Sequence, residues 1–499
     1  MTTTAPLPST GVTTDLEHTD VLIVGAGLSG IGAACHLQTE APGTSYVVLE
    51  ARGSSGGTWD LFRYPGVRSD SDMFTLGYEF RPWTRPKSIA DGGDILAYIR
   101  ETAAEHAVDE HISYSQRVTA AEWSSEQARW TVTVEHVDTG ERSTRTCGFV
   151  YLCSGYYRYD EGYTPDWPGR EDYRGLVVHP QHWPADLDVT GKRVVVIGSG
   201  ATAVTLVPAL AATAEKVTML QRSPSYLLPL PGTDPVANLL RRLLPADRAY
   251  AAIRWKNVHT STLMYEFMRK RPARTKALLR RLAIKRLPDG FDVDTHFRPS
   301  YDPWDQRMCM VPDGDFFDAV RAGTADVATD HVQAFTASGL RLRSGAELEA
   351  DIVVTATGLN LAPLGGIQLT VDGEPVAIPE RVAYKGMMLD GVPNLAFALG
   401  YTNASWTLKV DLVSSWVARL LRTMQQNGQA SATPQLPDTP MTTAPFIEMT
   451  SGYFERSRAI LPRQGDRAPW RLQQHYAKDG PMFRGPFTDP ALRFQLKPA

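Results

Sequence analysis

Two short runs of consecutive apolar residues, each followed by a glycine-rich turn and an alanine-rich segment, stand out along this chain. The first run is Val21–Val24 and the second is Val194–Ile197. Continuous apolar runs of this length are typical of parallel strands that are covered on both faces. A strand, a glycine turn and a helix in that order predict a dinucleotide-binding fold. We therefore expect an α/β protein with two interleaved Rossmann-like domains.

The first turn has the full spacing of a dinucleotide-binding site. Gly25 permits the tight turn, Gly27 leaves room for a pyrophosphate, and Gly30 lets the helix pack closely on the strand. The pyrophosphate then rests on the helix N-terminus. A second strand over 46–49 ends at Glu50, twenty residues after Gly30, where a carboxylate can accept the ribose hydroxyls. An acid there suits FAD or NAD, and the alternative is a chance glycine turn.

The second turn differs from the first at the position that selects the ribose. Gly198 and Gly200 hold the first two glycine positions, and Ala203 takes the third. The next apolar run, 217–220, is followed by Arg222 where the first site has an acid. A guanidinium suits a 2′-phosphate. The sequence therefore predicts FAD at the first fold and NADPH at the second, unless Arg222 is only a solvated surface arginine.

Composition excludes several classes of protein. The 499 residues predict two or three domains, and a formal net charge of −4 gives no footprint for nucleic acid. Four cysteines without a CxxC pair do not indicate a disulfide scaffold or a zinc site. Residues 1–16 are polar and are interpreted as a disordered leader, not a signal peptide. Glycines break the longest apolar run, so we expect no membrane span and a cytoplasmic protein.

Two histidines lie three residues apart in the stretch YRGLVVHPQHWP. His179 and His182 could be metal ligands, a general base or packed structural residues. A metal ion would need further ligands at suitable spacing, and the neighbouring sequence offers none. A general base is open on chemistry alone, because imidazole titrates near neutral pH. The residues therefore leave a structural role and a base open and make a metal site improbable.

Two further motifs resemble a known family. The linker between the folds carries Tyr173, Gly175, His179, Trp183 and Pro184, and an upstream stretch reads GGTWDLFRYPGVRSD over 56–70. Together they resemble the FAD-containing Baeyer–Villiger monooxygenases of the flavin-containing monooxygenase superfamily, and within them the ethionamide-activating subgroup. The family usually has Phe at the first of these positions. Relatives that oxidise nitrogen and sulfur usually have Tyr in place of Trp183.

The resemblance implies an enzyme that converts ketones to esters or lactones. It would use NADPH and O2 and act through a flavin C4a-peroxide. Arg307 matches the active-site arginine of the family, and Asp70 matches the carboxylate that orients it. A fixed cation suits such a site because arginine does not lose its proton at working pH. From local sequence alone, a surface ion pair for Arg307 and a helix cap or solvated loop residue for Asp70 are the alternatives. Oxygenation of sulfides or thioamides is the second activity, and a non-catalytic or electron-relay flavoprotein is the third interpretation.

Other site residues follow from the same resemblance. Trp59 and Asp60, inside the second motif, are expected on the cofactor side, and an ordinary buried aromatic is the alternative for Trp59. Many relatives have a lysine that helps to grip the 2′-phosphate where this chain has Gln306, so Arg222 would carry most of the preference for NADPH. The linker residues Gly175, His179 and Trp183 are expected to couple the two domains.

The predicted domains are interleaved along the chain. We expect an FAD-binding domain over 17–160 and 372–499, an NADPH-binding domain over 161–228 and 305–371, and a helical insertion over 229–304. Within the insertion, Arg269 to Arg286 holds nine basic residues and no acid, with Leu278, Leu279 and Leu282 at helical spacing. This stretch is interpreted either as a weak peripheral contact with anionic lipid or as a packed helix with a solvated basic face.

Overall fold

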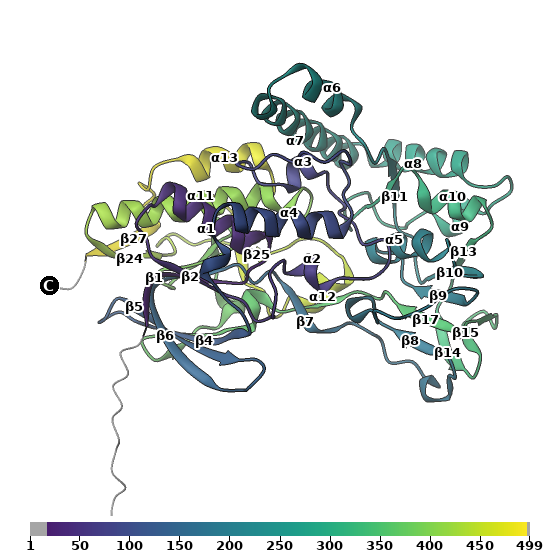
Figure 1. Ribbon diagram of the computed structural model, residues 1–499, viewed down its shortest axis with the longest axis horizontal. Coiled ribbons are helices and arrows are strands. Elements are labelled where there is room, and N and C mark those ends of the chain that lie inside the picture. The colour runs from purple at the N-terminus through teal and green to yellow at the C-terminus, as the bar shows by residue number, and fades with distance from the viewer. Residues whose placement is uncertain (1–16, 497–499) are drawn as a thin grey trace, which may run out of the picture.

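A mixed sheet and a parallel sheet form the framework of the protein (Figure 1). The structure is a computed structural model and describes residues 17–496. The first sheet has nine strands in the order β20-β19-β4-β5-β6-β1-β2-β3, with β23 paired to β6. Its strands are β1 (His18–Val24), β2 (Tyr46–Leu49), β3 (Ile112–Ser113), β4 (Gln116–Ser124), β5 (Arg129–His136), β6 (Arg142–Leu152), β19 (Gln368–Val371), β20 (Glu374–Pro375) and β23 (Leu395–Phe397).

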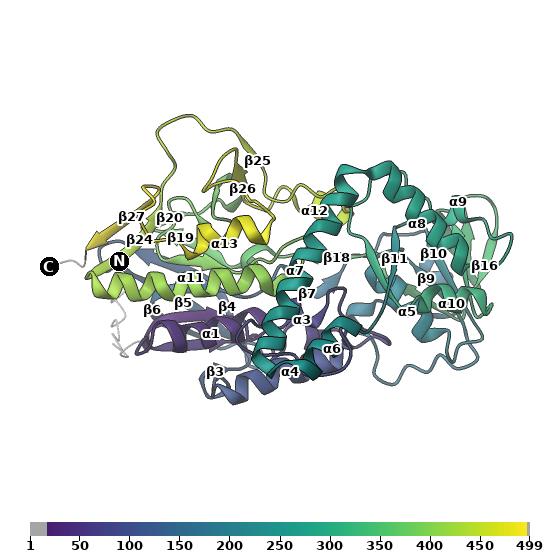
Figure 2. The same cartoon turned by 90° about the horizontal axis from the view of Figure 1, so that it is seen from above.

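The first apolar run forms the central strand β1, which pairs in parallel with β2 and β6. Alternate residues of β1 enter different cores: Val21 and Ile23 pack in one, Leu22 and Val24 in the other. Burial on both faces explains why the run has no polar interruption. One face is covered by α1 (Leu28–Glu40) and α11 (Trp406–Gln426), which lie side by side, and α4 (Gly92–Glu105) packs against α1 (Figure 2).

The second apolar run forms β9 in a five-stranded parallel sheet of order β13-β10-β9-β17-β8. Val194 and Val196 face one core and Val195 and Ile197 the other, as in the first fold. The elements of this fold are β8 (Leu176–Val178), β9 (Arg193–Ile197), α5 (Ala201–Leu210), β10 (Lys216–Gln221), α10 (Asp315–Arg321), β13 (Ala325–Thr329) and β17 (Ile352–Thr355). The expected pair of Rossmann-like folds is confirmed.

The chain returns to the first sheet earlier than the sequence indicated. The boundary was placed after residue 371, but β19 pairs in parallel with β4 of the first sheet. The segments that cross between the folds are β7 (Tyr157–Gly162) and β18 (Leu359–Leu361), which pair with each other. The sequence could not place this boundary, because the residues of a short, partly buried strand do not show which sheet the strand joins.

The insertion between the halves of the second fold is helical. It contains α6 (Pro235–Leu243), α7 (Ala246–Lys270), α8 (Pro272–Arg286) and α9 (Val293–His296). The basic stretch predicted as one helix from Arg269 to Arg286 is in fact two, because α7 ends at Lys270 and Pro272 starts α8. Of the predicted apolar stripe, Leu279 is buried but Leu278 is exposed. Among the described residues, no helix is long and apolar enough to cross a membrane.

Shorter elements complete the fold. They are α2 (Thr58–Leu61), α3 (Met73–Leu76), β11 (Leu227–Leu230), β12 (Cys309–Pro312), β14 (Val332–Thr336), β15 (Gly339–Leu342), β16 (Glu347–Glu349), β21 (Ala383–Tyr384), β22 (Met388–Leu389), β24 (Gln429–Pro434), β25 (Thr443–Pro445), α12 (Gly452–Ser457), β26 (Arg463–Gly465), α13 (Tyr476–Arg484) and β27 (Leu492–Leu496). The C-terminal elements from β24 onward lie with the first fold, except that α12 contacts the crossing strand β18 (Figure 1).

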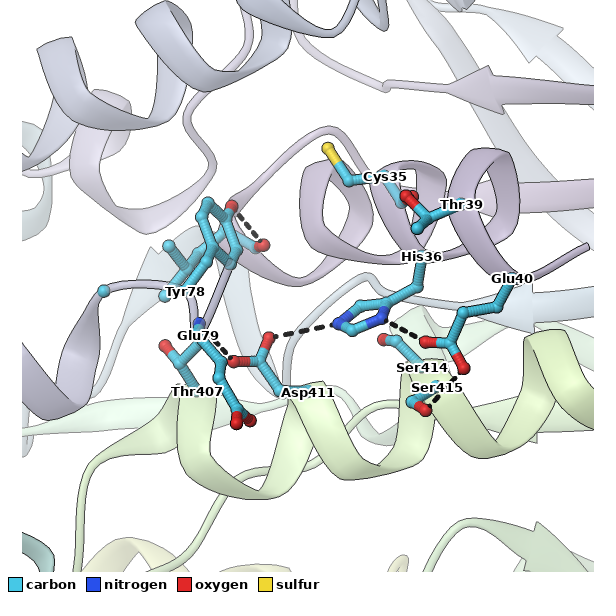
Figure 3. A network of polar contacts seen from close by, with 12 residues as sticks. Cys35, His36, Thr39, Glu40, Tyr78, Glu79, Thr407, Asp411, Ser414 and Ser415 are labelled. Atoms are coloured by element: carbon cyan, nitrogen blue, oxygen red, sulfur yellow. Dashed lines mark hydrogen bonds and ion pairs between the residues drawn. The ribbon is translucent and has the colours of Figure 1, made fainter. Parts of the chain in front are cut away.

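A charged contact joins α1 to α11 (Figure 3). His36 of α1 lies 2.8 Å from Glu40 through Nδ1 and 3.6 Å from Asp411 of α11 through Nε2. Burial lowers the pKa of His36, but the two carboxylates raise it more, to about 9. The ring is therefore protonated at neutral pH. It bridges a carboxylate of each helix on the face of the first sheet that α1 and α11 cover.

Candidate active site

A cavity of about 460 Å³ lies where the two folds meet. Its wall combines the turn after β1, the 56–70 stretch, the start of α5 and the loop before β12. Six of the residues singled out in the sequence line this cavity: Gly25, Gly27, Glu50, Trp59, Asp70 and Arg307. Side chains that were predicted from three separate stretches of sequence therefore share one site.

The turn after β1 is shaped to admit a dinucleotide. Gly25 has a φ of +102°, which favours glycine, and a Cβ on Gly30 would lie 1.8 Å from the carbonyl oxygen of Gly25. Helix α1 starts directly behind the turn with no acidic residue in its first turn, which leaves its N–H groups to an anion. Glu50 is held by the N–H of Ala26 at 2.7 Å. The residues present fit the adenosine diphosphate part of FAD.

The second turn repeats this arrangement at the start of α5. Gly198 has a φ of +138°, and a Cβ there would lie 2.2 Å from the carbonyl oxygen of Ala356. A Cβ on Gly200 would meet no atom within 4 Å, and the side chain of Ala203 is buried. Helix α5 also lacks an acid in its first turn, and its residue Thr202 lines the cavity. The cavity thus has an anion-binding helix end on each side.

Arg307 and Asp70 form an ion pair inside the cavity. Arg307 Nη2 lies 2.8 Å from Asp70 Oδ2, and each side chain is about one-third exposed. The carboxylate of Asp70 raises the pKa of Arg307, so the guanidinium keeps its charge at any working pH. Asp70 ends the 56–70 motif of the first fold, and Arg307 lies in the loop before β12, where the chain leads back into the second fold. The pair therefore joins the two folds at the cavity.

Aromatic side chains that sequence reasoning did not assign surround this pair. Tyr156 and Tyr157 lie in the wall, and Tyr156 stacks on Trp406 with 5.3 Å between ring centroids. Tyr453 of α12 lies close enough for the charge of Arg307 to act on its hydroxyl, although burial dominates and raises the pKa of Tyr453. The consecutive tyrosines after Gly155 are the one sequence signal that could have marked this wall.

The loop before α11 is held from behind by a buried ion pair. Tyr401, which lines the cavity, donates a hydrogen bond of 2.6 Å to Asp479 Oδ2. Lys409 Nζ lies 3.0 Å from the same oxygen. Burial lowers the pKa of Lys409, and Asp479 opposes that shift. All three side chains are buried, so α13 anchors the loop that forms one wall of the cavity.

Known proteins resemble this chain along nearly its whole length. Family models for an NAD(P)-binding Rossmann-like domain and for flavin-binding monooxygenase-like proteins match residues 23–83 and 86–234. The FAD-containing monooxygenase EthA of Mycobacterium tuberculosis is 54% identical over 97% of this chain and 99% of its own. EthA of Mycolicibacterium smegmatis is 53% identical over 94% and 95%. The chain belongs to the FAD-containing monooxygenases.

Solved structures of other monooxygenases share the fold of this family member. An oxidized steroid monooxygenase bound to NADP superposes with a TM-score of 0.72, covering 93% of this chain and 97% of its own at 22% identity. A cyclohexanone monooxygenase from Rhodococcus sp. Phi1 bound to NADP+ gives a TM-score of 0.69 at 20% identity, with coverages of 84% and 87%.

Asp60 lies in this monooxygenase at a different place from the one expected. Its side chain is 1% exposed and binds three arginines: Arg52 at 2.5 Å, Arg63 at 2.9 Å and Arg100 at 2.8 Å. It is absent from the cavity wall, whereas its neighbour Trp59 is part of it. The carboxylate therefore holds the 52–63 loop against α4 instead of pointing at the cavity.

The linker histidine of this monooxygenase joins the crossing segments. His179 Nδ1 accepts the N–H of Gln181 at 3.1 Å, so Nε2 carries the proton and donates to the carbonyl of Gly358 at 3.2 Å. Burial lowers the pKa of His179, which keeps the ring neutral. A Cβ on Gly162 would lie 1.9 Å from the ring. His179 thus packs where β7, β17 and the linker meet.

The other linker residues also have packing contacts. Trp183 packs against the core of the second fold, and a side chain on Gly175 would overlap the ring of Tyr173. His182 is exposed, and its Nε2 lies 3.1 Å from the carbonyl oxygen of Asp160. Within residues 17–496, no three His, Cys, Asp or Glu side chains are grouped to hold a metal ion.

Proposed function

We propose that this monooxygenase uses NADPH and O2 to insert oxygen beside the carbonyl of ketones, giving esters or lactones. The observation that carries the proposal is the Arg307–Asp70 pair in a cavity with a dinucleotide-type turn on each side. FAD would occupy the turn of α1, and NADPH the turn of α5. Bound FAD would supply hydride acceptance and oxygen activation.

The residues of the chain supply charge, orientation and shelter from water. Arg307 places a permanent positive charge where negative charge develops on the attacked carbonyl oxygen. Asp70 fixes the direction of that guanidinium. The rings of Tyr156 and Trp406 form an apolar wall beside it, which excludes water and strengthens the electrostatic effect.

Oxygenation of sulfides or thioamides is the second candidate activity. The aromatic wall favours it, because the sulfur of a thioether substrate makes favourable contacts with aromatic rings. We expect purified holoenzyme to consume NADPH and O2 and to yield ester from a panel of linear, cyclic and aryl ketones by gas chromatography. Oxygenated sulfide without any ester would select the second activity. NADPH consumption without either product would refute both.

Arg222 is expected to govern the choice between NADPH and NADH. It is exposed directly after β10, where the 2′-phosphate would lie, whereas Gln306 is neutral, and neither side chain lines the cavity. A charge-assisted phosphate contact contributes about 1.5–3 kcal/mol. Arg222→Ala should therefore raise the KM for NADPH about ten- to hundred-fold more than the KM for NADH.

A second arginine provides the comparison. Arg456 of α12 stacks on Tyr163 at 3.5 Å, and burial together with the charge of Arg222 lowers the pKa of Arg456. Arg456→Ala should shift the KM for NADPH in the same direction if both arginines grip the phosphate. Equal KM changes for NADPH and NADH in Arg222→Ala would place the phosphate elsewhere.

A further inference from the structure

The surface of the helical insertion is unusually apolar. Of the sixteen large apolar side chains that are exposed in residues 17–496, seven lie on α6, α7 and the turn between them. We call this set the hairpin surface: Val236, Leu239, Leu243, Leu244, Trp255, Leu263 and Phe267. The two helices stand at the top edge of the molecule in Figure 1, away from both sheets.

Helix α6 presents its apolar side to solvent. Val236, Leu239 and Leu243 follow helical spacing and are all exposed, Leu243 to 69%. The opposite side attaches the helix to the protein, because Arg241 donates hydrogen bonds to the carbonyls of Trp83 and Arg85. Ala237 and Leu240 pack on the protein on this inner side, so the exposed row is an additional apolar stripe that is free to contact a partner.

Helix α7 continues the pattern along one side. Trp255, Leu263 and Phe267 are exposed at intervals of four or eight residues, with Trp255 and Leu263 each at 66%. The other side of α7 is tied to the first fold, where Arg254 pairs with Asp411 at 3.2 Å and Asn257 binds Asp72 at 2.8 Å. The exposed row therefore belongs to a helix held firmly in place, and its direction is fixed.

The same region carries a strong positive charge. Residues 235–286 contain fourteen basic and two acidic residues, a formal charge of +12 in a chain whose net charge is −4. Several of these bases are neutralised by ion pairs, including Arg269, Lys270, Lys276 and Arg280. Six exposed bases have no ion-pair partner in the described part of the chain: Arg242, Arg248, Arg271, Arg274, Arg281 and Lys285.

We propose that the hairpin surface docks on a membrane that contains anionic lipid. A bilayer surface offers both requirements at once, because acyl chains accept the leucines and Trp255, and anionic headgroups attract the unpaired bases. A second copy of the chain fits less well, because two surfaces that each carry unpaired bases would repel each other. The sequence pointed to the stretch 269–286, which holds four of the six unpaired bases but buries Leu279, and most of the exposed large apolar side chains of the insertion lie instead on α6 and α7.

The test is co-sedimentation of the full-length holoenzyme with large unilamellar vesicles of phosphatidylglycerol and phosphatidylcholine. We expect binding that rises with the phosphatidylglycerol fraction and weakens as salt increases. The double variant Leu239→Glu/Leu243→Glu should bind at least about tenfold less. Arg242→Glu/Arg248→Glu should bind at least about 25-fold less, because each base near an anionic surface contributes about five-fold.

A matched control separates docking from a general surface effect. Leu436 is also exposed, to 44%, but lies outside the insertion, so Leu436→Glu should sediment like the unmodified protein. NADPH oxidation without vesicles should be the same in all variants, which shows that they fold. Failure of the unmodified holoenzyme to bind vesicles of any phosphatidylglycerol content would overturn the proposal. So would binding by both double variants that equals binding by the unmodified protein, or a change from dimer to monomer in Leu239→Glu/Leu243→Glu on size exclusion without any lipid effect.

Discussion

Replacing Arg307 with alanine is expected to separate NADPH consumption from oxygen transfer. Hydride donation depends on how the two nucleotides lie on the turns of α1 and α5, which Arg307 does not build. Oxygen insertion depends on the fixed charge that Arg307 holds against Asp70 at 2.8 Å. Removing one such electrostatic partner costs on the order of 10²–10³ in rate. NADPH oxidation should continue more slowly and release hydrogen peroxide in place of ester.

Stopped-flow absorbance, peroxide release and ester yield together measure this separation. Asp70→Ala should shift all three in the same direction but less, because Asp70 orients the charge without supplying it. Arg269→Ala is the matched control, since Arg269 forms an exposed ion pair with Asp305 two residues from Arg307. It should leave coupling unchanged. Ester formation near the native rate in Arg307→Ala would remove Arg307 from the mechanism.

Asp479→Ala is expected to cause the largest loss of stability among single substitutions outside the cavity. The carboxylate is fully buried and faces Lys409 at 3.0 Å and the hydroxyl of Tyr401 at 2.6 Å. Its removal leaves an uncompensated ammonium in the interior, which typically costs about 3–5 kcal/mol. Urea unfolding followed by tryptophan fluorescence should show a clearly lower midpoint. Flavin should also be released earlier, because Tyr401 lines the cavity.

A double variant tests the cause of that loss. Lys409→Met/Asp479→Leu removes both charges and keeps the volume, so it should recover much of the stability lost in Asp479→Ala. Arg458→Ala serves as the surface comparison, because Arg458 pairs with Glu455 in an exposed position. It should change the midpoint very little. A midpoint for Asp479→Ala equal to that of Arg458→Ala would show that the buried pair contributes no stability.

Local sequence was sufficient for the features that depend on neighbours in the chain. The apolar runs 21–24 and 194–197, the turns behind them and the charge at Glu50 and Arg222 all follow from residues a few positions apart. Arg307 and Asp70 are 237 positions apart, and only the family resemblance brought them together before the structure did. The spacing of apolar residues along the chain predicts single helices and strands, and it does not show which distant residues meet in the fold.

The features that the sequence did not predict depend on which distant side chains pair with each other in the fold. Three arginines form ion pairs with Asp60. Their neighbours in the sequence do not distinguish them from arginines whose side chains are solvated. Arg456 approaches the second fold only because α12 returns to it. The break between α7 and α8 was visible as Pro272, but a run of nine basic residues drew the interpretation toward one continuous helix.

The interleaved topology has a consequence for synthesis on the ribosome. The second sheet is built from 176–355 alone, so all its strands emerge in one uninterrupted stretch. The first sheet begins to emerge at β1 but waits for β19 and β23, and for the covering helix α11, all of which follow the second sheet along the chain. At about 5–20 residues per second, that delay is on the order of tens of seconds. During it, the apolar face that α11 later covers depends on chaperones for protection. A chain that stops before Trp406 lacks the ring that stacks on Tyr156 in the cavity wall.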